Sequence, residues 1–173
     1  MTAKAYSSAS ASHVAGKTSK TQEFDYDLVV IGSGPSGQRA AIQAAKLGKR
    51  TAIIERARAV GGVCVHTGTI PSKTFREAVI HLSGFRERGI YGSSYRVKQD
   101  IGIDDLLYRV QLVVRSEIDV IRNQMTRNRV ELIESTARFV DAHTLELESA
   151  SGHGRRQISA DIIVIACGTE AAR

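Results

Sequence analysis

A short apolar strand that runs into a glycine-rich turn constrains this chain more than any other feature. Residues 28–31 are apolar and mostly β-branched, as expected of a strand that a parallel sheet buries on both faces. Gly32, Gly34 and Gly37 follow in the spacing G-x-G-x-x-G, and a helix is expected over residues 35–47. In this motif the first glycine permits a tight turn, the second lets a pyrophosphate approach the backbone, and the third lets the helix pack against the strand. We therefore predict a phosphate site at the N-terminus of this helix.

A second strand and an acidic residue support the interpretation of the motif as a dinucleotide site. Residues 51–54 form another apolar strand after Gly48, and this strand ends on Glu55. A carboxylate about 20 positions past the glycine motif accepts hydrogen bonds from ribose hydroxyls and repels a 2′-phosphate. The sequence thus predicts a βαβ unit that binds an adenosine dinucleotide without a 2′-phosphate. The alternative is a βαβ unit whose glycine turn binds nothing.

Composition excludes several other classes of protein. An apolar content of 42% and a charged content of 24% are typical of a soluble globular protein, and no apolar run approaches the length of a membrane span. The net charge of +6 is spread along the chain and aromatic residues make up only 5%, which favours a solvated surface over a nucleic-acid interface. Cys64 and Cys167 are far apart and lack partners at metal-ligand spacing. We therefore expect no metal site, no disulfide scaffold and a reducing, cytoplasmic setting.

The first 23 residues differ in composition from the rest. Residues 1–23 are rich in Ser, Ala, Lys and Thr and contain almost nothing apolar to bury, which predicts a disordered tail. They have neither the apolar segment of a secretory signal nor the arginines of a transit peptide. The remaining residues, 24–173, have the length and apolar content of one domain.

A second glycine-rich stretch covers residues 61–73. Glycine at this density places backbone against something flat or phosphorylated. Pro71 suits the first turn of a helix, and Phe75, Val79 and Leu82 then fall four and three residues apart. This spacing predicts that the three side chains form one buried face.

The same stretch carries a resemblance to a known family. It resembles the active-site signature of the flavoprotein disulfide reductases, the family of lipoamide dehydrogenase and glutathione reductase. That signature is G-G-x-C-x4-C-x-P-S-K, and its two cysteines form a redox disulfide. Here Cys64 holds the first cysteine position and Thr69 the second. The segment from Gly68 to Lys73 is similar to that of the soluble, FAD-containing pyridine nucleotide transhydrogenases.

The resemblance extends over residues 25–173 and implies a fold and a cofactor. The fold is an α/β, Rossmann-like FAD-binding domain, in which a parallel sheet begins with a βαβ unit and carries an antiparallel β-meander as a crossover. Without a second sulfur at Thr69, no dithiol can carry electrons from flavin to a disulfide substrate. What remains is hydride transfer into and out of FAD, because the cofactor carries the redox chemistry.

Two residues are predicted to be catalytic. Lys73 resembles the family lysine near the reactive edge of the flavin ring, where a cation stabilises negative charge on the reduced cofactor. The alternative is an exposed lysine in the first turn of a helix. Cys64 would lie near a helix N-terminus, where a thiolate is stabilised. Its alternative role is that of a small hydrophobic side chain beside the ring.

The remainder of the chain is predicted to be scaffold. From Asp104 a long helix carries an apolar stripe three and four residues apart, formed by Leu107, Val110, Val114, Ile118, Ile121 and Met125. Residues 130–133 are predicted to form a further sheet strand. A three-stranded meander is then expected over residues 136–140, 144–148 and 155–159.

A last buried strand, residues 161–165, ends in what resembles the A-T-G-S/T turn of the family. Cys167 stands at the Thr position, so the resemblance transfers only the backbone of Ala166 and Gly168. It also places the backbone of Ala137 against the adenine. Motif and resemblance together predict the FAD-contacting residues: Gly32, Ser33, Gly34, Pro35, Ser36, Gly37, Glu55, Arg56, Gly61, Gly62, Val63, Cys64, Gly68, Thr69, Lys73, Ala137, Ala166 and Gly168.

The resemblance also predicts a function for the parent protein. Family members continue with a second G-x-G-x-x-G domain for the nicotinamide nucleotide and with a dimerisation domain, so we expect an N-terminal piece of a longer, homo-oligomeric flavoprotein. Its predicted activity is NAD(P)+ transhydrogenation, in which NADPH reduces FAD and the flavin passes hydride to NAD+. The alternatives are a flavin-dependent dehydrogenase or diaphorase that acts on quinones or other acceptors, and a non-catalytic FAD-binding remnant or partner subunit.

Overall fold

The chain opens with the predicted βαβ unit. The structure, a computed structural model, describes residues 24–95, 97–149 and 154–169, so the predicted tail of residues 1–23 lies outside the described residues. Strand β1 (Tyr26–Ile31) leads into helix α1 (Pro35–Lys46) and then strand β2 (Thr51–Glu55), which pairs with β1 in parallel. Gly48 has a φ of +79°, the left-handed conformation that commonly ends a helix.

The parallel sheet has four strands in the order β3–β2–β1–β5. Strand β3 (Glu131–Phe139) pairs with β2, and β5 (Arg155–Ile165) pairs with β1. The two strands of the βαβ unit thus lie at the centre of the sheet. Val29, Val30 and Ile53 are fully buried, which confirms the expectation that these apolar runs would be covered on both faces.

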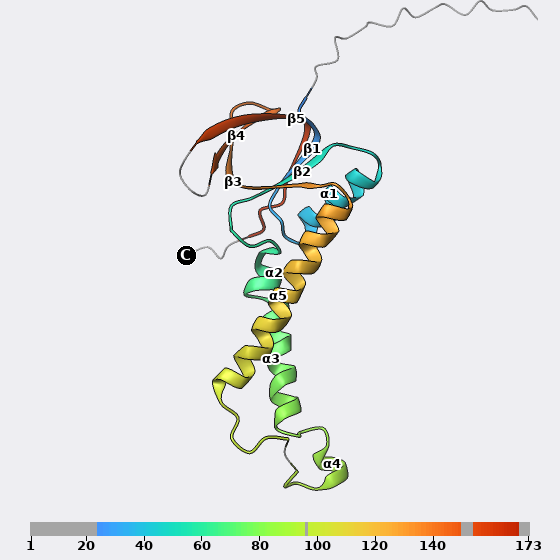
Figure 1. The fold of residues 1–173 in the computed structure, drawn as a ribbon, viewed down its shortest axis with the longest axis vertical. Coiled ribbons are helices and arrows are strands. Elements are labelled where there is room, and N and C mark those ends of the chain that lie inside the picture. The colour runs from blue at the N-terminus through green and yellow to red at the C-terminus, as the bar shows by residue number, and fades with distance from the viewer. Residues whose placement is uncertain (1–23, 96, 150–153, 170–173) are drawn as a thin grey trace, which may run out of the picture.

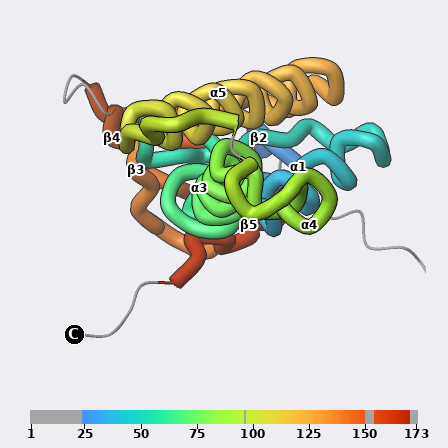
Figure 2. Tube along the Cα trace, turned by 90° about the horizontal axis from the view of Figure 1, so that it is seen from below, coloured from blue at the N-terminus to red at the C-terminus, as the bar shows by residue number. Residues whose placement is uncertain are grey.

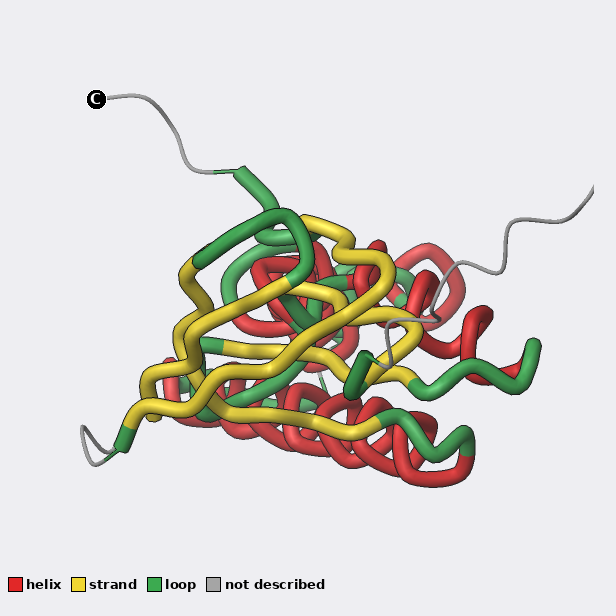
Figure 3. The backbone as a smooth tube through the Cα atoms, turned by 90° about the horizontal axis from the view of Figure 1, so that it is seen from above, coloured by secondary structure: helices red, strands yellow, loops and turns green. Residues whose placement is uncertain are grey.

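The predicted meander is confirmed, but its strands are longer than expected. Strand β4 (Thr144–Ser149) pairs antiparallel with the second half of β3 and with the first half of β5, which closes the five strands into a barrel (Figures 1 and 3). The sequence predicted separate strands over 130–133 and 136–140, and again over 155–159 and 161–165. These predictions were wrong, because no glycine or proline interrupts either segment and each continues as one strand. Residues 161–165 are also not buried as predicted: Ile162 is 54% exposed, because this half of β5 pairs with β1 alone and lies at the edge of the parallel sheet.

Two apolar clusters cover the two faces of the parallel sheet. The first lies inside the barrel and receives side chains from all five strands, among them Ile54, Leu145 and Ile158. The second joins the outer face to the helices and includes Val30, Ile53 and Met125. Figure 3 shows a long helix running beside the strands, along their lower side in this view.

The other helices extend away from the barrel. Helix α2 (Gly62–His66) is followed by α3 (Thr69–Leu82), α4 (Arg88–Tyr91) and the long α5 (Ile103–Arg127). Helices α3 and α5 lie side by side, with α4 at the end farthest from the strands (Figures 1 and 2). None of the helices in the described ranges is both long and apolar enough to cross a membrane.

Burial on these helices differs from the predicted stripes. In α3, Val79 is 39% exposed, and the buried position is Ala78. The predicted face was wrong at Val79, because α3 turns Ala78 toward α5, where Ala78 lines a cavity together with Tyr108 and Arg109. In α5, Ile121 and Met125 are buried as expected, whereas Leu107 is 41% exposed, because that end of the helix lies far from the sheet (Figure 1).

Candidate functional site

The three glycines of the turn between β1 and α1 have different surroundings. A Cβ atom on Gly32 would lie 2.4 Å from the carbonyl oxygen of Ala166, and one on Gly37 would lie 2.0 Å from that of Gly32. Both glycines are therefore required by backbone packing. A Cβ on Gly34 would have no neighbour within 4 Å, so this position faces open space. A turn that is packed on two sides and open at its middle glycine fits a phosphate ligand.

The N-terminus of α1 opens onto the same space. Its N-cap is Gly34, which offers no side-chain hydrogen bond, and the first turn contains no acidic residue. Pro35 fills the first helical position, and both Pro35 and Ser36 are exposed. The free N–H groups of a first turn and its positive dipole end attract an anion. The first turn of α1 thus supplies the positive potential and the hydrogen-bond donors that a phosphate site needs.

Glu55 lies where β2 ends, but its carboxylate already has partners within the protein. Its Oε2 accepts hydrogen bonds from the Ser33 N–H (2.9 Å) and hydroxyl (2.6 Å), and its Oε1 accepts one from the Ala57 N–H (2.9 Å). Burial alone would raise the pKa of Glu55, but the hydrogen bonds from Ser33, Ala57 and Arg56 outweigh it and hold this pKa below its ordinary value. The group is therefore an anion at neutral pH.

These bonds limit what else Glu55 can accept. A carboxylate offers about four lone-pair sites, and at least three are used here. The sequence did not predict the bonds from Ser33 and Ala57, because only the position of Glu55 at the end of a strand was visible. The predicted bond to a ribose hydroxyl therefore has at most about one site left, and the Arg56 N–H also acts on this carboxylate.

The second glycine-rich stretch packs directly on the first. A Cβ on Gly62 would lie 3.1 Å from the Cα of Gly34, and the Gly61 N–H donates to the Ser33 hydroxyl at 3.1 Å. Both loops thus border the space that Gly34 faces. The structure brings together the two motifs that the sequence identified separately.

Residues 63–73 continue away from this contact through α2 and into α3. Cys64 is half-buried in α2, and Val63 beside it is 65% exposed. Helix α3 begins at Thr69 with Gly68 as an N-cap that forms no side-chain hydrogen bond. Thr69 and Lys73 are both exposed. Like α1, helix α3 therefore presents an uncapped, positive N-terminus.

The last predicted contacts lie in the turn after β5 and in the antiparallel part of β3. The Ala166 N–H donates to the carbonyl oxygen of Ile31 at 2.8 Å, which places the turn after β5 against the glycine turn. Gly168, two residues farther on, is exposed with a φ of +75°. Ala137 lies opposite Leu147 in the antiparallel part of β3, and its side chain packs on the cluster inside the barrel. The contact between the Ala137 backbone and the adenine that the resemblance implies stays a prediction.

The sequence missed two polar residues of this site. Gln38 donates from Nε2 to the carbonyl oxygen of Ser33 at 2.7 Å, and Ser33 itself is fully buried. In the sequence, the only sign of these interactions was a serine between two glycines of the motif. His66 is half-buried with Nε2 2.9 Å from the carbonyl oxygen of Val60. Among the described residues, no group of three or more His, Cys, Asp and Glu side chains is placed to hold a metal ion.

Sequence comparison assigns this arrangement to a family. The profile of the pyridine nucleotide-disulphide oxidoreductases matches residues 26–173. The chain is 56% identical over 149 residues to the soluble pyridine nucleotide transhydrogenase of Mycobacterium tuberculosis (strain ATCC 25177 / H37Ra), covering 86% of this chain and 32% of that protein. It is 40% identical over 148 residues to that of Colwellia psychrerythraea, covering 86% and 31%. The chain thus spans about a third of the length of these relatives.

Solved structures give the same fold. The HOCl-induced flavoprotein disulfide reductase RclA of Escherichia coli superposes with a TM-score of 0.65 at 26% identity, covering 86% of this chain and 29% of that one. A Cu(II) complex of a mutant of that reductase gives a TM-score of 0.69 at 25% identity, covering 87% and 30%.

Proposed function

The chain belongs to the pyridine nucleotide-disulphide oxidoreductase family, and we propose that residues 24–173 form the FAD-binding domain of a soluble NAD(P)+ transhydrogenase. One observation carries the proposal. Thr69 stands where the disulfide reductases have their second redox cysteine, in a chain 56% identical to a protein named soluble pyridine nucleotide transhydrogenase. A threonine hydroxyl cannot form a disulfide with Cys64, so the reaction proposed here uses no dithiol.

The residues at the glycine turn would hold the cofactor. The N–H groups of the first turn of α1 bind the pyrophosphate, and Gly34 leaves room for it. Glu55 accepts a ribose hydroxyl at the lone pair that Ser33 and Ala57 leave free. Arg56, Gly61, Gly62, Val63, Gly68, Ala137, Ala166 and Gly168 remain the predicted backbone and side-chain neighbours of FAD.

The flavin supplies the chemistry when it is bound: it takes a hydride from one nicotinamide nucleotide and gives it to another. The protein holds the ring and sets its electrostatics. Lys73 and the uncapped N-terminus of α3 provide positive charge in the segment assigned to the ring. Cys64, half-buried in α2, would lie beside the ring.

We assign NADPH as the hydride donor and NAD+ as the acceptor of the complete protein, which we place in the cytoplasm as a homo-oligomer. The direction and the two nucleotides follow from the resemblance to the transhydrogenases. The cytoplasmic setting rests on the sequence, in which two widely separated cysteines are more typical of a reducing compartment than of a disulfide scaffold.

A steady-state assay of the complete protein tests this function. NADPH is supplied with thionicotinamide-NAD+ as acceptor in one reaction and with a quinone in the other. A transhydrogenase reduces the nucleotide analogue faster than the quinone, whereas a diaphorase shows the reverse order. Absence of both activities in a protein that retains FAD would identify a non-catalytic FAD-binding subunit.

A further inference from the structure

We propose that Ser33 is a positioning residue, whose hydroxyl joins the glycine turn, the carboxylate of Glu55 and the loop at Gly61 into one rigid frame for the dinucleotide. The proposal rests on the proposed function only in naming FAD as the ligand. Ser33 has no exposed surface, so in this proposal it acts through its neighbours and replaces the direct FAD contact that the sequence predicted for it.

The direction of each hydrogen bond at Ser33 is fixed by chemistry. The Gly61 N–H lies 3.1 Å from Oγ and can only donate, so the hydroxyl accepts there. The hydroxyl hydrogen is then directed to the Glu55 carboxylate, with Oγ 2.6 Å from Oε2. The Ser33 N–H reaches the same oxygen at 2.9 Å. One buried side chain therefore uses both its donor and an acceptor site.

Removal of this hydroxyl disturbs two parts of the site at once. Glu55 loses the hydrogen bond that contributes most to keeping it ionised, and the Gly61 N–H is left buried without an acceptor. Gly61 precedes Gly62, which lies against Gly34, and the chain then continues directly to Cys64. Loss of the hydroxyl should therefore loosen both the carboxylate and the segment that carries Cys64.

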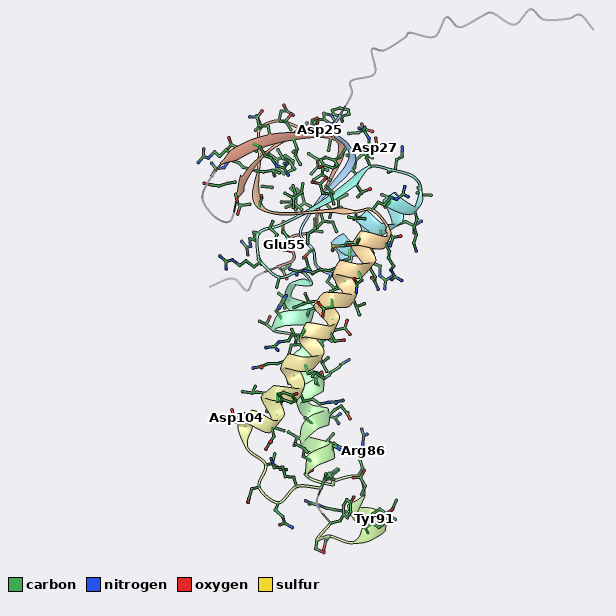
Figure 4. The ribbon with its side chains drawn as sticks, viewed as in Figure 1. Asp25, Asp27, Glu55, Arg86, Tyr91 and Asp104 are labelled. Carbon is green, nitrogen blue, oxygen red and sulfur yellow. The ribbon has the colours of Figure 1, made fainter. Side chains whose placement is uncertain are left out.

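The chain contains a matched control for this arrangement. The Ser159 N–H and hydroxyl both donate to Oδ2 of Asp25, at 2.7 and 2.9 Å, and the Asp25 N–H donates to the Ser159 hydroxyl at 3.1 Å. This is the same pattern of one carboxylate oxygen and one backbone donor around a serine. Figure 4 shows Asp25 and Glu55 at opposite ends of the strands, so the control lies away from the candidate site.

The first experiment measures the Kd of FAD for the apo form of the complete protein by flavin fluorescence. Ser33→Ala should raise this Kd by about tenfold, because a buried hydrogen bond to a charged group is lost. Ser159→Ala should leave it within about twofold of wild type, as expected of a surface change far from the site. Ser33→Cys, which keeps the size and a weak donor, should give an intermediate value and carries the comparison if Ser33→Ala does not fold.

A double-mutant cycle separates positioning from a general packing effect. If Ser33 acts through Glu55, then Ser33→Ala combined with Glu55→Gln should raise the Kd by less than the product of the two single effects. Multiplicative effects, or a Kd for Ser33→Ala equal to that of wild type, would overturn the proposal. A wild-type protein that binds no FAD would instead refute the proposed function.

The second measurement needs no cofactor. Alkylation of the apoprotein by iodoacetamide is followed by peptide mass spectrometry, with the exposed Cys167 as the internal reference. Ser33→Ala should accelerate alkylation of Cys64 relative to Cys167, and Ser159→Ala should leave this ratio unchanged. An unchanged ratio in Ser33→Ala would show that the hydroxyl does not hold the Gly61 loop, and the proposal would fail.

Discussion

At the scale of single residues, Thr69 is the position at which this chain departs from the active-site signature of the disulfide reductases. It begins α3 and is exposed, while Cys64 is half-buried in the preceding helix α2. Only a short turn separates the two helices, because α2 ends at His66 and α3 begins at Thr69. The resemblance to the disulfide reductases assigns the two positions to a sulfur pair, of which only one sulfur is present.

Restoring the missing sulfur tests this assignment. Thr69→Cys should allow a disulfide to Cys64, because the substitution recreates the C-x4-C spacing and an uncapped helix N-terminus favours the thiolate. After oxidation with diamide, this variant should lose about two more titratable thiols than wild type, since one disulfide consumes two. Thr74→Cys, one turn farther along α3, serves as the control and should lose no additional thiols. Equal thiol counts in Thr69→Cys and wild type would show that residues 64 and 69 do not face each other.

Ser33 shows why part of the site could not be read from the sequence. The positions of Gly32, Gly34, Gly37 and Glu55 follow from a local motif, and the structure has them at the junction of β1 with α1 and at the end of β2. The partners of Ser33 are 22 and 28 residues away, at Glu55 and Gly61. Which loop meets a serine at that separation depends on the folded packing, and no local pattern encodes it.

At the scale of elements, the glycines at the junction of β1 with α1 have two different roles, one in packing and one in the predicted phosphate site. Gly37 is required by the close approach of the helix to the turn, whereas Gly34 faces open space. The two glycines therefore have different predicted consequences when each is replaced by alanine.

Gly37→Ala should lower the stability of the protein by about 1–3 kcal/mol, because the added methyl overlaps the Gly32 carbonyl. Gly34→Ala should change the stability by less than about 1 kcal/mol, since its φ of −66° is open to any residue. The same variant should weaken FAD binding by about tenfold, because the methyl enters the space predicted for the pyrophosphate. Thermal unfolding and FAD titration of both variants provide the test. A Gly34→Ala protein with normal FAD affinity would place the phosphate elsewhere.

A second pair of elements is linked by Tyr26 of β1 and Glu131 of β3. The Tyr26 hydroxyl donates to Oε2 of Glu131 at 2.6 Å, and burial followed by this hydrogen bond raises the pKa of Tyr26 from 10.0 to about 12. Because the folded-state pKa is raised, this contribution to stability is complete below pH 10.0 and is lost as the pH rises toward 12.

The stability difference between wild type and Tyr26→Phe should therefore depend on pH. The variant should have a lower Tm than wild type at pH 8, and the two Tm values should converge as the pH rises above 10.0. Tyr108→Phe is the control, since Tyr108 is 70% exposed, and its Tm should follow that of wild type at every pH. A Tm difference that stays constant with pH would mean that the hydrogen bond to Glu131 does not form.

Among the strands, too, local features could be predicted from the sequence and long-range pairing could not. The βαβ unit and the existence of a meander followed from apolar runs and turn residues. The continuity of β3 and β5 could not be predicted from these local features. The closure of the barrel could not be predicted either, because β1 meets β5 through pairs such as Tyr26 with Ala160. Pairing at that separation depends on register and twist over the whole sheet, which a local pattern does not specify.

At the scale of the whole molecule, the single G-x-G-x-x-G motif sets what these 173 residues can do alone. The structure packs that motif against the loop of Gly61 and Gly62, so the two glycine-rich stretches belong to one candidate site. If FAD occupies this site, the described part of the chain contains no second site with the same features for NADPH or NAD+.

The purified 173-residue chain should therefore fail to oxidise NADPH, even in the presence of FAD and thionicotinamide-NAD+. The complete protein, assayed at the same molar concentration, is the positive control, and free FAD without protein gives the background rate. FAD titration of the same sample shows whether the chain has kept its cofactor site, so that inactivity is not mistaken for misfolding. NADPH oxidation above the background would mean that the glycine turn also accepts a nicotinamide nucleotide. The assignment of Gly34 and the first turn of α1 to FAD would then be wrong.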